Sequence, residues 1–132
     1  MTRSTGRPLE GSPTRRDDTV RVLGDCDEWK RLVSFWSVTM TLADGKYISD
    51  RWKDVVPKFC GYAKQRFEEA GRGPVALVGS YEGWGIVSSF LCQVAWDQIR
   101  DQHGNPVFNA AERRMAAELG RRIVVECNAA SQ

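Results

Sequence analysis

The chain has 132 residues, of which 42% are hydrophobic and 27% charged, with 19 basic and 17 acidic side chains and a formal net charge of +2. This composition is typical of one globular domain, and the near balance of charge excludes the strongly basic class of nucleic-acid-binding domains. Because the four cysteines form no Cys-x-x-Cys pair, we expect no metal site, and we expect no cofactor.

The first segment differs in composition from the rest of the chain. Residues 1–17 are rich in Arg, Gly, Pro, Ser and Thr, which bury too little apolar surface to offset the entropy of ordering. We therefore expect a disordered arm over 1–17 and a single helical domain over 18–132. The arm lacks the apolar core of a secretory signal, and the longest largely apolar run, 84–96, is shorter than the ~20 residues of a membrane span. These observations predict a cytoplasmic protein with no membrane span.

The first helix is predicted over 27–42, where Asp25 or Asp27 can cap its start. Residues 22–23 are interpreted as an irregular turn before it. An alternating pattern over 35–42 leaves a strand as the alternative there. The apolar stripe of this helix consists of Trp29, Leu32, Val33, Trp36 and Met40.

A second helical pattern follows Ser49, a good capping residue, and ends at Gly71. Pro57 lies inside the pattern, where it removes a backbone hydrogen bond and clashes with the preceding turn. The sequence is equally consistent with two short helices, 49–56 and 57–70, and with one bent helix.

The short apolar run 75–78 also has two interpretations. Pro74 can serve as the first residue of a short helix, and the same run can be a strand. Periodicity does not distinguish the two in so few residues, and both stay open.

The last fifty residues predict a helical hairpin. Apolar residues cover more than half of the circumference of a helix over 84–100, which indicates packing on several sides. A turn at 103–106 ends it, and Asn109 with Glu112 forms a capping-box pattern for a last helix over 108–127. The predicted fold class is therefore all-α, a compact helical bundle with a central hydrophobic helix and a C-terminal helical hairpin.

No catalytic pattern accompanies these helices. His103, the one histidine, lies in a predicted turn with no catalytic partner nearby in sequence and is interpreted as a surface residue. The glycines at 79, 83 and 85 match neither the nucleophile elbow nor a phosphate-binding loop. Four arginines on the last helix are diluted by glutamates, so we expect no nucleic-acid partner. The chain is predicted to be a binding protein and not an enzyme.

The cysteines divide into two groups. Cys60, Cys92 and Cys127 fall on apolar helix faces, where cysteine acts as a small hydrophobe. Cys26 stands between two aspartates and is expected to be exposed, which makes it the candidate for an intermolecular disulfide in a homodimer.

The segment Gly83-Trp84-Gly85-Ile86-Val87-Ser88-Ser89-Phe90-Leu91 resembles the first homology motif of the Bcl-2 family of apoptosis regulators, Asn-Trp-Gly-Arg followed by a hydrophobic helix. Trp84 and Gly85 match its Trp-Gly pair, and 89–91 match its small-aromatic-apolar triplet. Ile86 replaces the motif arginine, Gly83 replaces the asparagine, and the second homology motif is missing. A compact, divergent viral homologue in the host cell cytoplasm is the version that fits these departures.

The resemblance implies a function. A Bcl-2-like protein inhibits apoptosis by sequestering the amphipathic death-motif helix of a pro-apoptotic partner in a hydrophobic groove. With the motif arginine replaced, Arg66 or Arg72 is the candidate partner of a ligand aspartate. The expected groove residues are Phe59, Tyr62, Phe67, Val78, Tyr81, Trp84, Gly85, Val87 and Phe90.

The alternative is a small helical interaction or oligomerisation protein of phage or bacterial origin, without catalytic activity. One structural feature separates the two interpretations. A central helix at Trp84 surrounded by other helices favours the family resemblance, whereas a strand at 75–87 excludes it.

Overall fold

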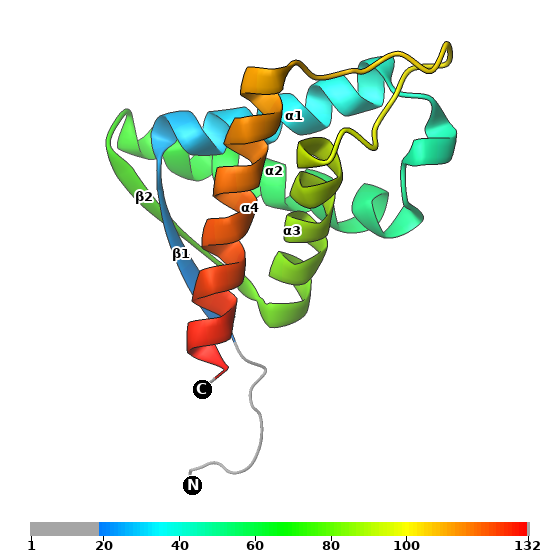
Figure 1. Cartoon of the computed structure of the whole chain (residues 1–132). Coiled ribbons are helices and arrows are strands. Elements are labelled where there is room, and N and C mark those ends of the chain that lie inside the picture. Colours follow the sequence, from blue (N-terminus) through cyan, green and yellow to red (C-terminus); the bar gives the residue numbers. More distant parts are fainter. Residues whose placement is uncertain (1–18, 132) are drawn as a thin grey trace, which may run out of the picture.

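The computed structural model describes residues 19–131, so the expected arm over 1–17 lies outside the described residues. Four α-helices, a short 3-10 turn at Gly45–Tyr47 and two strands make up the described part. Figure 1 shows the helices packed around α3, with the strands along one side. The elements, in chain order, are β1 (Thr19–Asp25), α1 (Cys26–Leu42), α2 (Asp50–Ala70), β2 (Pro74–Ser80), α3 (Tyr81–Ala95) and α4 (Ala110–Ala130).

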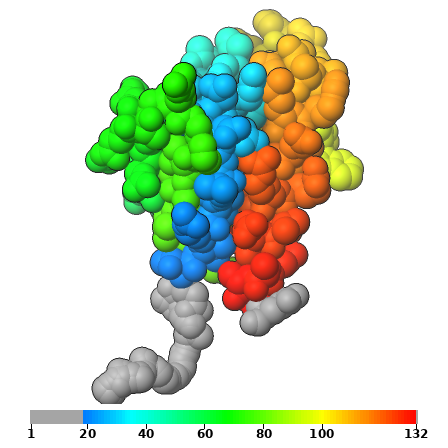
Figure 2. Space-filling view, turned by 90° about the vertical axis from the view of Figure 1, so that its left-hand side faces the viewer, coloured from blue at the N-terminus to red at the C-terminus, as the bar shows by residue number. Residues whose placement is uncertain are grey.

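The fold is mostly helical but not all-α, because β1 and β2 form a two-stranded antiparallel sheet. Thr19 pairs with Ser80 at one end of the sheet and Asp25 with Pro74 at the other. Figure 2 shows β1 at the surface between β2 and α4. Residues 22–23 therefore belong to a strand and not to an irregular turn, and of the two readings of 75–78 the strand is correct.

Two tryptophans fasten this sheet to the helices. The indole nitrogen of Trp29 donates to the carbonyl of Val75 at 2.9 Å, and that of Trp84 donates to the carbonyl of Val20 at 2.8 Å. Their rings lie 6.1 Å apart between centroids. A two-stranded sheet is marginal alone, so this support from α1 and α3 is what keeps it in place.

The first two helices agree with the sequence. α1 begins after Asp25, whose capping box with Glu28 satisfies free backbone N–H groups, and the alternative of a strand over 35–42 is wrong. α2 begins after Ser49, ends at Gly71 in a positive-φ conformation, and continues through Pro57 as one helix.

The C-terminal hairpin is also present, with a shorter first helix than predicted. α3 ends at Ala95, because Asp97 adopts a positive φ of 58° and turns the chain five residues earlier than the sequence indicated. α4 begins at the predicted capping box of Asn109 and Glu112. α3 and α4 run side by side in opposite directions (Figure 1).

The core surrounds α3. Phe90 takes edge-on contacts from Trp36 and Trp52, at centroid distances of 5.2 and 5.5 Å. At the far side of the bundle, Arg122 of α4 donates to the carboxylate of Glu28 on α1 at 2.6 Å. This arginine holds the pKa of Glu28 below its ordinary value. Within residues 19–131, no helix combines the length and apolar character that crossing a bilayer requires.

Candidate interaction surface

Most of the expected groove residues on α3 lie in the core. Trp84, Val87 and Phe90 are fully buried, and Phe67 on α2 is 8% exposed. These side chains pack against the sheet and the other helices and are closed to a ligand. The Trp-Gly segment therefore places a core tryptophan, and a groove open at Trp84 is not present.

The ring of Phe59 leaves no room for a side chain at two glycines near Trp84, Gly79 and Gly83. A Cβ atom built at Gly79 would lie 2.4 Å from the ring of Phe59, and one at Gly83 would lie 2.9 Å from it. The same ring packs on Trp84 with centroids 4.7 Å apart. Gly79 and Gly83 thus provide the space in which α2 packs against the start of α3.

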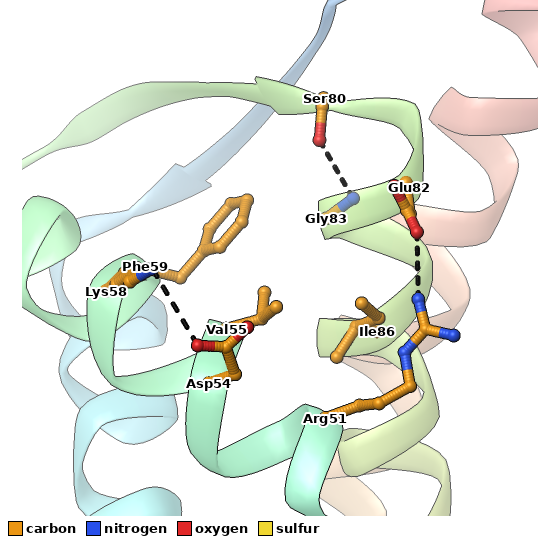
Figure 3. A pocket seen from close by; sticks show the side chains of 9 residues that line it. All are labelled: Arg51, Asp54, Val55, Lys58, Phe59, Ser80, Glu82, Gly83 and Ile86. Carbon is orange, nitrogen blue, oxygen red and sulfur yellow. Dashed lines mark hydrogen bonds and ion pairs between the residues drawn. The ribbon is translucent and has the colours of Figure 1, made fainter.

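A cleft of about 320 Å³ opens beside this contact, between α2 and the start of α3. Its floor includes Phe59 and Ile86, and Figure 3 shows the Phe59 ring pointing toward the turn from β2 into α3. Arg51 pairs with Glu82 across the rim at 2.8 Å, and both side chains are largely exposed. Four charged side chains, those of Arg51, Asp54, Lys58 and Glu82, line this cleft, so it offers little to an apolar helix.

The remaining expected groove residues do not form a common site with the cleft. Tyr62 is partly buried and its hydroxyl accepts a hydrogen bond from the Val78 N–H at 3.1 Å, which caps the edge of β2. Val78 and Tyr81 are 45% and 46% exposed. Of the predicted set, Tyr81 and Gly85 lie on the exposed side of α3, and Gly85 has open space around it.

The candidate cations also lie elsewhere. Arg66 and Arg72 are exposed near the end of α2, and Arg66 borders a separate surface depression with Arg21 and Glu69. Neither residue lines the cleft beside Phe59. His103 is exposed in its turn, as expected.

The expectation for Cys26 is wrong. Its side chain is 2% exposed and its thiol donates to the carbonyl of Phe67, because Cys26 begins α1 on the side that packs against α2. Cys92 is the exposed cysteine, contrary to its predicted burial. Cys60 and Cys127 are buried as expected, and burial raises the pKa of the Cys60 thiol to about 12.

An apolar groove with a volume of about 270 Å³ lies between α3 and α4. Trp96, at the end of α3, is 72% exposed and borders this groove. Val124 and Val125 on α4 are 46% and 54% exposed at its other end. We call this surface the α3–α4 face; its lining consists of Ser88, Cys92, Ala95, Trp96, Ala116, Ala117, Gly120, Arg121, Val124 and Val125.

Small residues make the groove. A Cβ at Gly120 would lie 3.4 Å from the Cβ of Leu91, so the glycine lets α3 and α4 approach closely. Ala117, Ser88 and Cys92 above this contact leave room between the two helices. The result is an apolar channel with a large aromatic side chain at one end.

The charge distribution fits an interface. The sequence from Gly83 to Trp96 contains no charged residue, although one side of this stretch is exposed. Of the described residues that line the groove, Arg121 alone carries a charge, and its contact to Glu118 is long at 3.8 Å. An exposed helix face without charges, ending in an exposed tryptophan, is typical of a protein-binding surface.

No family model matches the chain, and comparisons with curated proteins and with solved structures give no significant match.

Proposed function

We propose that this chain is an interaction protein that acts through the α3–α4 face, where it binds the apolar side of a partner helix. The observation that carries the proposal is the 72% exposure of Trp96 beside a groove of small and aliphatic side chains. Tryptophan is enriched among the residues that dominate binding energy at interfaces, and an open groove between two helices fits a third helix.

The Bcl-2-like function stays a narrower version of this proposal. α3 packs against α2 and α4 with Trp84 buried, which favours the family resemblance, whereas the strand at Pro74–Ser80 argues against it. None of the expected groove residues lines the α3–α4 face. The more general role of a helical interaction or oligomerisation protein is therefore the one that the geometry supports best.

A matched pair of substitutions tests the proposed function. Ala117→Glu places a charged side chain in the groove, and Ala111→Glu makes the same change on the exposed first turn of α4, outside the groove. Association is measured by sedimentation of the protein alone and by titration with fluorescent amphipathic peptides, including a death-motif panel. We expect Ala117→Glu to weaken the observed association at least about tenfold, because a buried unpaired charge costs more than about 1.4 kcal/mol. Equal effects of the two variants, or no association in either assay, would contradict the proposal.

A further inference from the structure

We infer that the helices covering the α3–α4 face are α3 and α4 of a second copy of this chain, related by a two-fold axis across both helices. This inference rests on the proposed function and names the partner of the same surface. In such an arrangement each α3 lies antiparallel on the other α3, and each α4 on the other α4. The two copies then form a four-helix bundle of two layers.

The shape of α3 is self-complementary. Trp96 and Gly85 stand eleven positions apart, close to three turns, so both project from the same exposed side. A Cβ at Gly85 would meet nothing within 4 Å. An axis midway between Phe90 and Leu91 brings Trp96 of each copy opposite Gly85 of the other, where the missing side chain leaves room for the indole.

The charges of α4 are self-complementary as well. Glu118 and Arg121 are 66% and 71% exposed, and they approach each other only to 3.8 Å within one chain. An axis between Leu119 and Gly120 places Arg121, which lines the groove, level with Glu118 of the other copy, which stands on the α1 side of α4 beside Glu28 and Arg31. The same operation therefore brings opposite charges to the same level twice, at the rim of the contact.

The same two-fold axis passes through the midpoint of the contact on α3 and the midpoint of the contact on α4. A Cβ at Gly120 lies 3.4 Å from the Cβ of Leu91 and 4.0 Å from the carbonyl of Ser88, so Gly120 stands level with the middle of α3. The midpoint that α4 requires is therefore at the height of the midpoint that α3 requires. Since α3 and α4 lie side by side and one axis can cross both helices at this height, a single two-fold rotation maps each helix antiparallel onto its own mate.

The size of the face is sufficient for a modest dimer. Helices of 15 and 21 residues are about 22 and 31 Å long, and two side by side are about 20 Å wide. The face is therefore about 530 Å² per copy and about 1,060 Å² in total, which just exceeds the about 1,000 Å² that a specific interface needs. The uncharged stretch from Gly83 to Trp96 lets two copies of a chain with a net charge of +2 approach without repulsion at α3.

The axis makes a specific cross-linking prediction. A midpoint between Phe90 and Leu91 places Ser89 of one copy opposite Cys92 of the other, and both residues are exposed. Within one helix, side chains three positions apart are about 5–6 Å apart between Cβ atoms, too far for an unstrained disulfide. Ser89→Cys therefore tests contact between copies.

The experiment compares Ser89→Cys with Ser34→Cys, which places an added thiol on the exposed side of α1, in the full chain under mild oxidant. We expect Ser89→Cys to form a covalent dimer through Cys92 at least about tenfold faster than the control, because paired thiols react at millimolar effective concentration. Adding Cys92→Ser should abolish this dimer. Sedimentation of the unmodified chain should show twice 14.9 kDa at high concentration.

Failure of the dimer inference and failure of the proposed function give different results. A chain that stays at 14.9 kDa at every concentration, with Ser89→Cys no faster than Ser34→Cys, overturns the second copy as partner. If Ala117→Glu still weakens peptide binding in that case, the proposed function stands. A dimer that Ala117→Glu leaves intact, and that Ser89→Cys does not trap, overturns the placement of the dimer on this face.

Discussion

The two tryptophans of α3 occupy opposite situations. Trp84, in the first turn, is fully buried, donates its indole N–H to the carbonyl of Val20, and packs on Trp29 and Phe59. Trp96, just past the last turn, is 72% exposed and borders an open groove. The comparison separates a structural residue from the residue that we propose for recognition at the end of the same helix. The motif around Trp84 builds the core, and the surface available to a partner begins at the other end.

The largest expected effect on stability comes from replacing the buried tryptophan, Trp84. Trp84→Ala should lower the free energy of unfolding by about 4 kcal/mol, because it leaves a large cavity and removes the partner of the Val20 carbonyl. Trp96→Ala should change it by less than about 0.5 kcal/mol. Urea unfolding at low protein concentration measures both. Similar losses in the two variants would mean that Trp96 is part of the fold.

The rates at which the four cysteines are alkylated extend the comparison of exposed and buried residues to the rest of the molecule. Cys92 on the α3–α4 face is exposed, whereas Cys26, Cys60 and Cys127 are buried. In the folded monomer at low protein concentration we expect Cys92 to be alkylated at least about 100-fold faster than the others, since buried groups react only through openings that cost several kcal/mol. Burial also raises the pKa of the Cys60 thiol to about 12, which leaves little thiolate at neutral pH. Mass spectrometry of partially labelled protein identifies the modified residue, and rapid labelling of Cys60 would contradict the packing.

The glycines on either side of Trp84 offer a matched pair. Gly83→Ala should lower the free energy of unfolding by about 1–2 kcal/mol, because its Cβ would lie 2.9 Å from both Phe59 and the hydroxyl of Ser80. Gly85→Ala should raise it by about 0.5–1 kcal/mol, since alanine restricts the unfolded chain and the site is open. Thermal unfolding of the monomer measures the two changes. Destabilisation by Gly85→Ala would indicate a neighbour at that position.

The smallest effect concerns the ion pair between α1 and α4. The Arg122 guanidinium keeps the pKa of Glu28 below its ordinary value, so the stabilisation is present above the unfolded-state pKa and disappears as the pH falls through the folded-state pKa. Both side chains are about one-third exposed, and solvent screening limits the pair to about 1 kcal/mol or less. Arg122→Met should therefore cost a little stability at pH 7 and nothing at strongly acidic pH. A difference from wild type that persists at pH 2 would contradict this pairing.

The helices could be predicted because their ends carry local signals. Ser49 and the Asn109–Glu112 box act within one turn, so the sequence identifies the starts of α2 and α4 without knowledge of the fold. The strands could not be identified in the same way. Residues 75–78 are too short for periodicity to decide, and their strand conformation depends on pairing with residues more than fifty positions away.

The candidate surface was missed for a related reason. An apolar stripe looks the same whether it faces the core or a groove, so Trp84 and Phe90 were expected in the binding site. The exposure of Trp96 follows from the positive φ of Asp97, which ends α3 where the apolar pattern continues toward Ile99. A useful signal in the sequence was the absence of charge from Gly83 to Trp96, which is unusual for a helix with an exposed side.

The most direct test of the central claim is the mass of the chain in solution, measured by sedimentation equilibrium for Ala117→Glu, Ala111→Glu and wild type over a range of concentrations. The account predicts that wild type and Ala111→Glu pass from 14.9 kDa to twice that mass as concentration rises, while Ala117→Glu stays at 14.9 kDa. Identical curves for the three proteins would contradict the assignment of the α3–α4 face as the surface on which two copies of this chain meet.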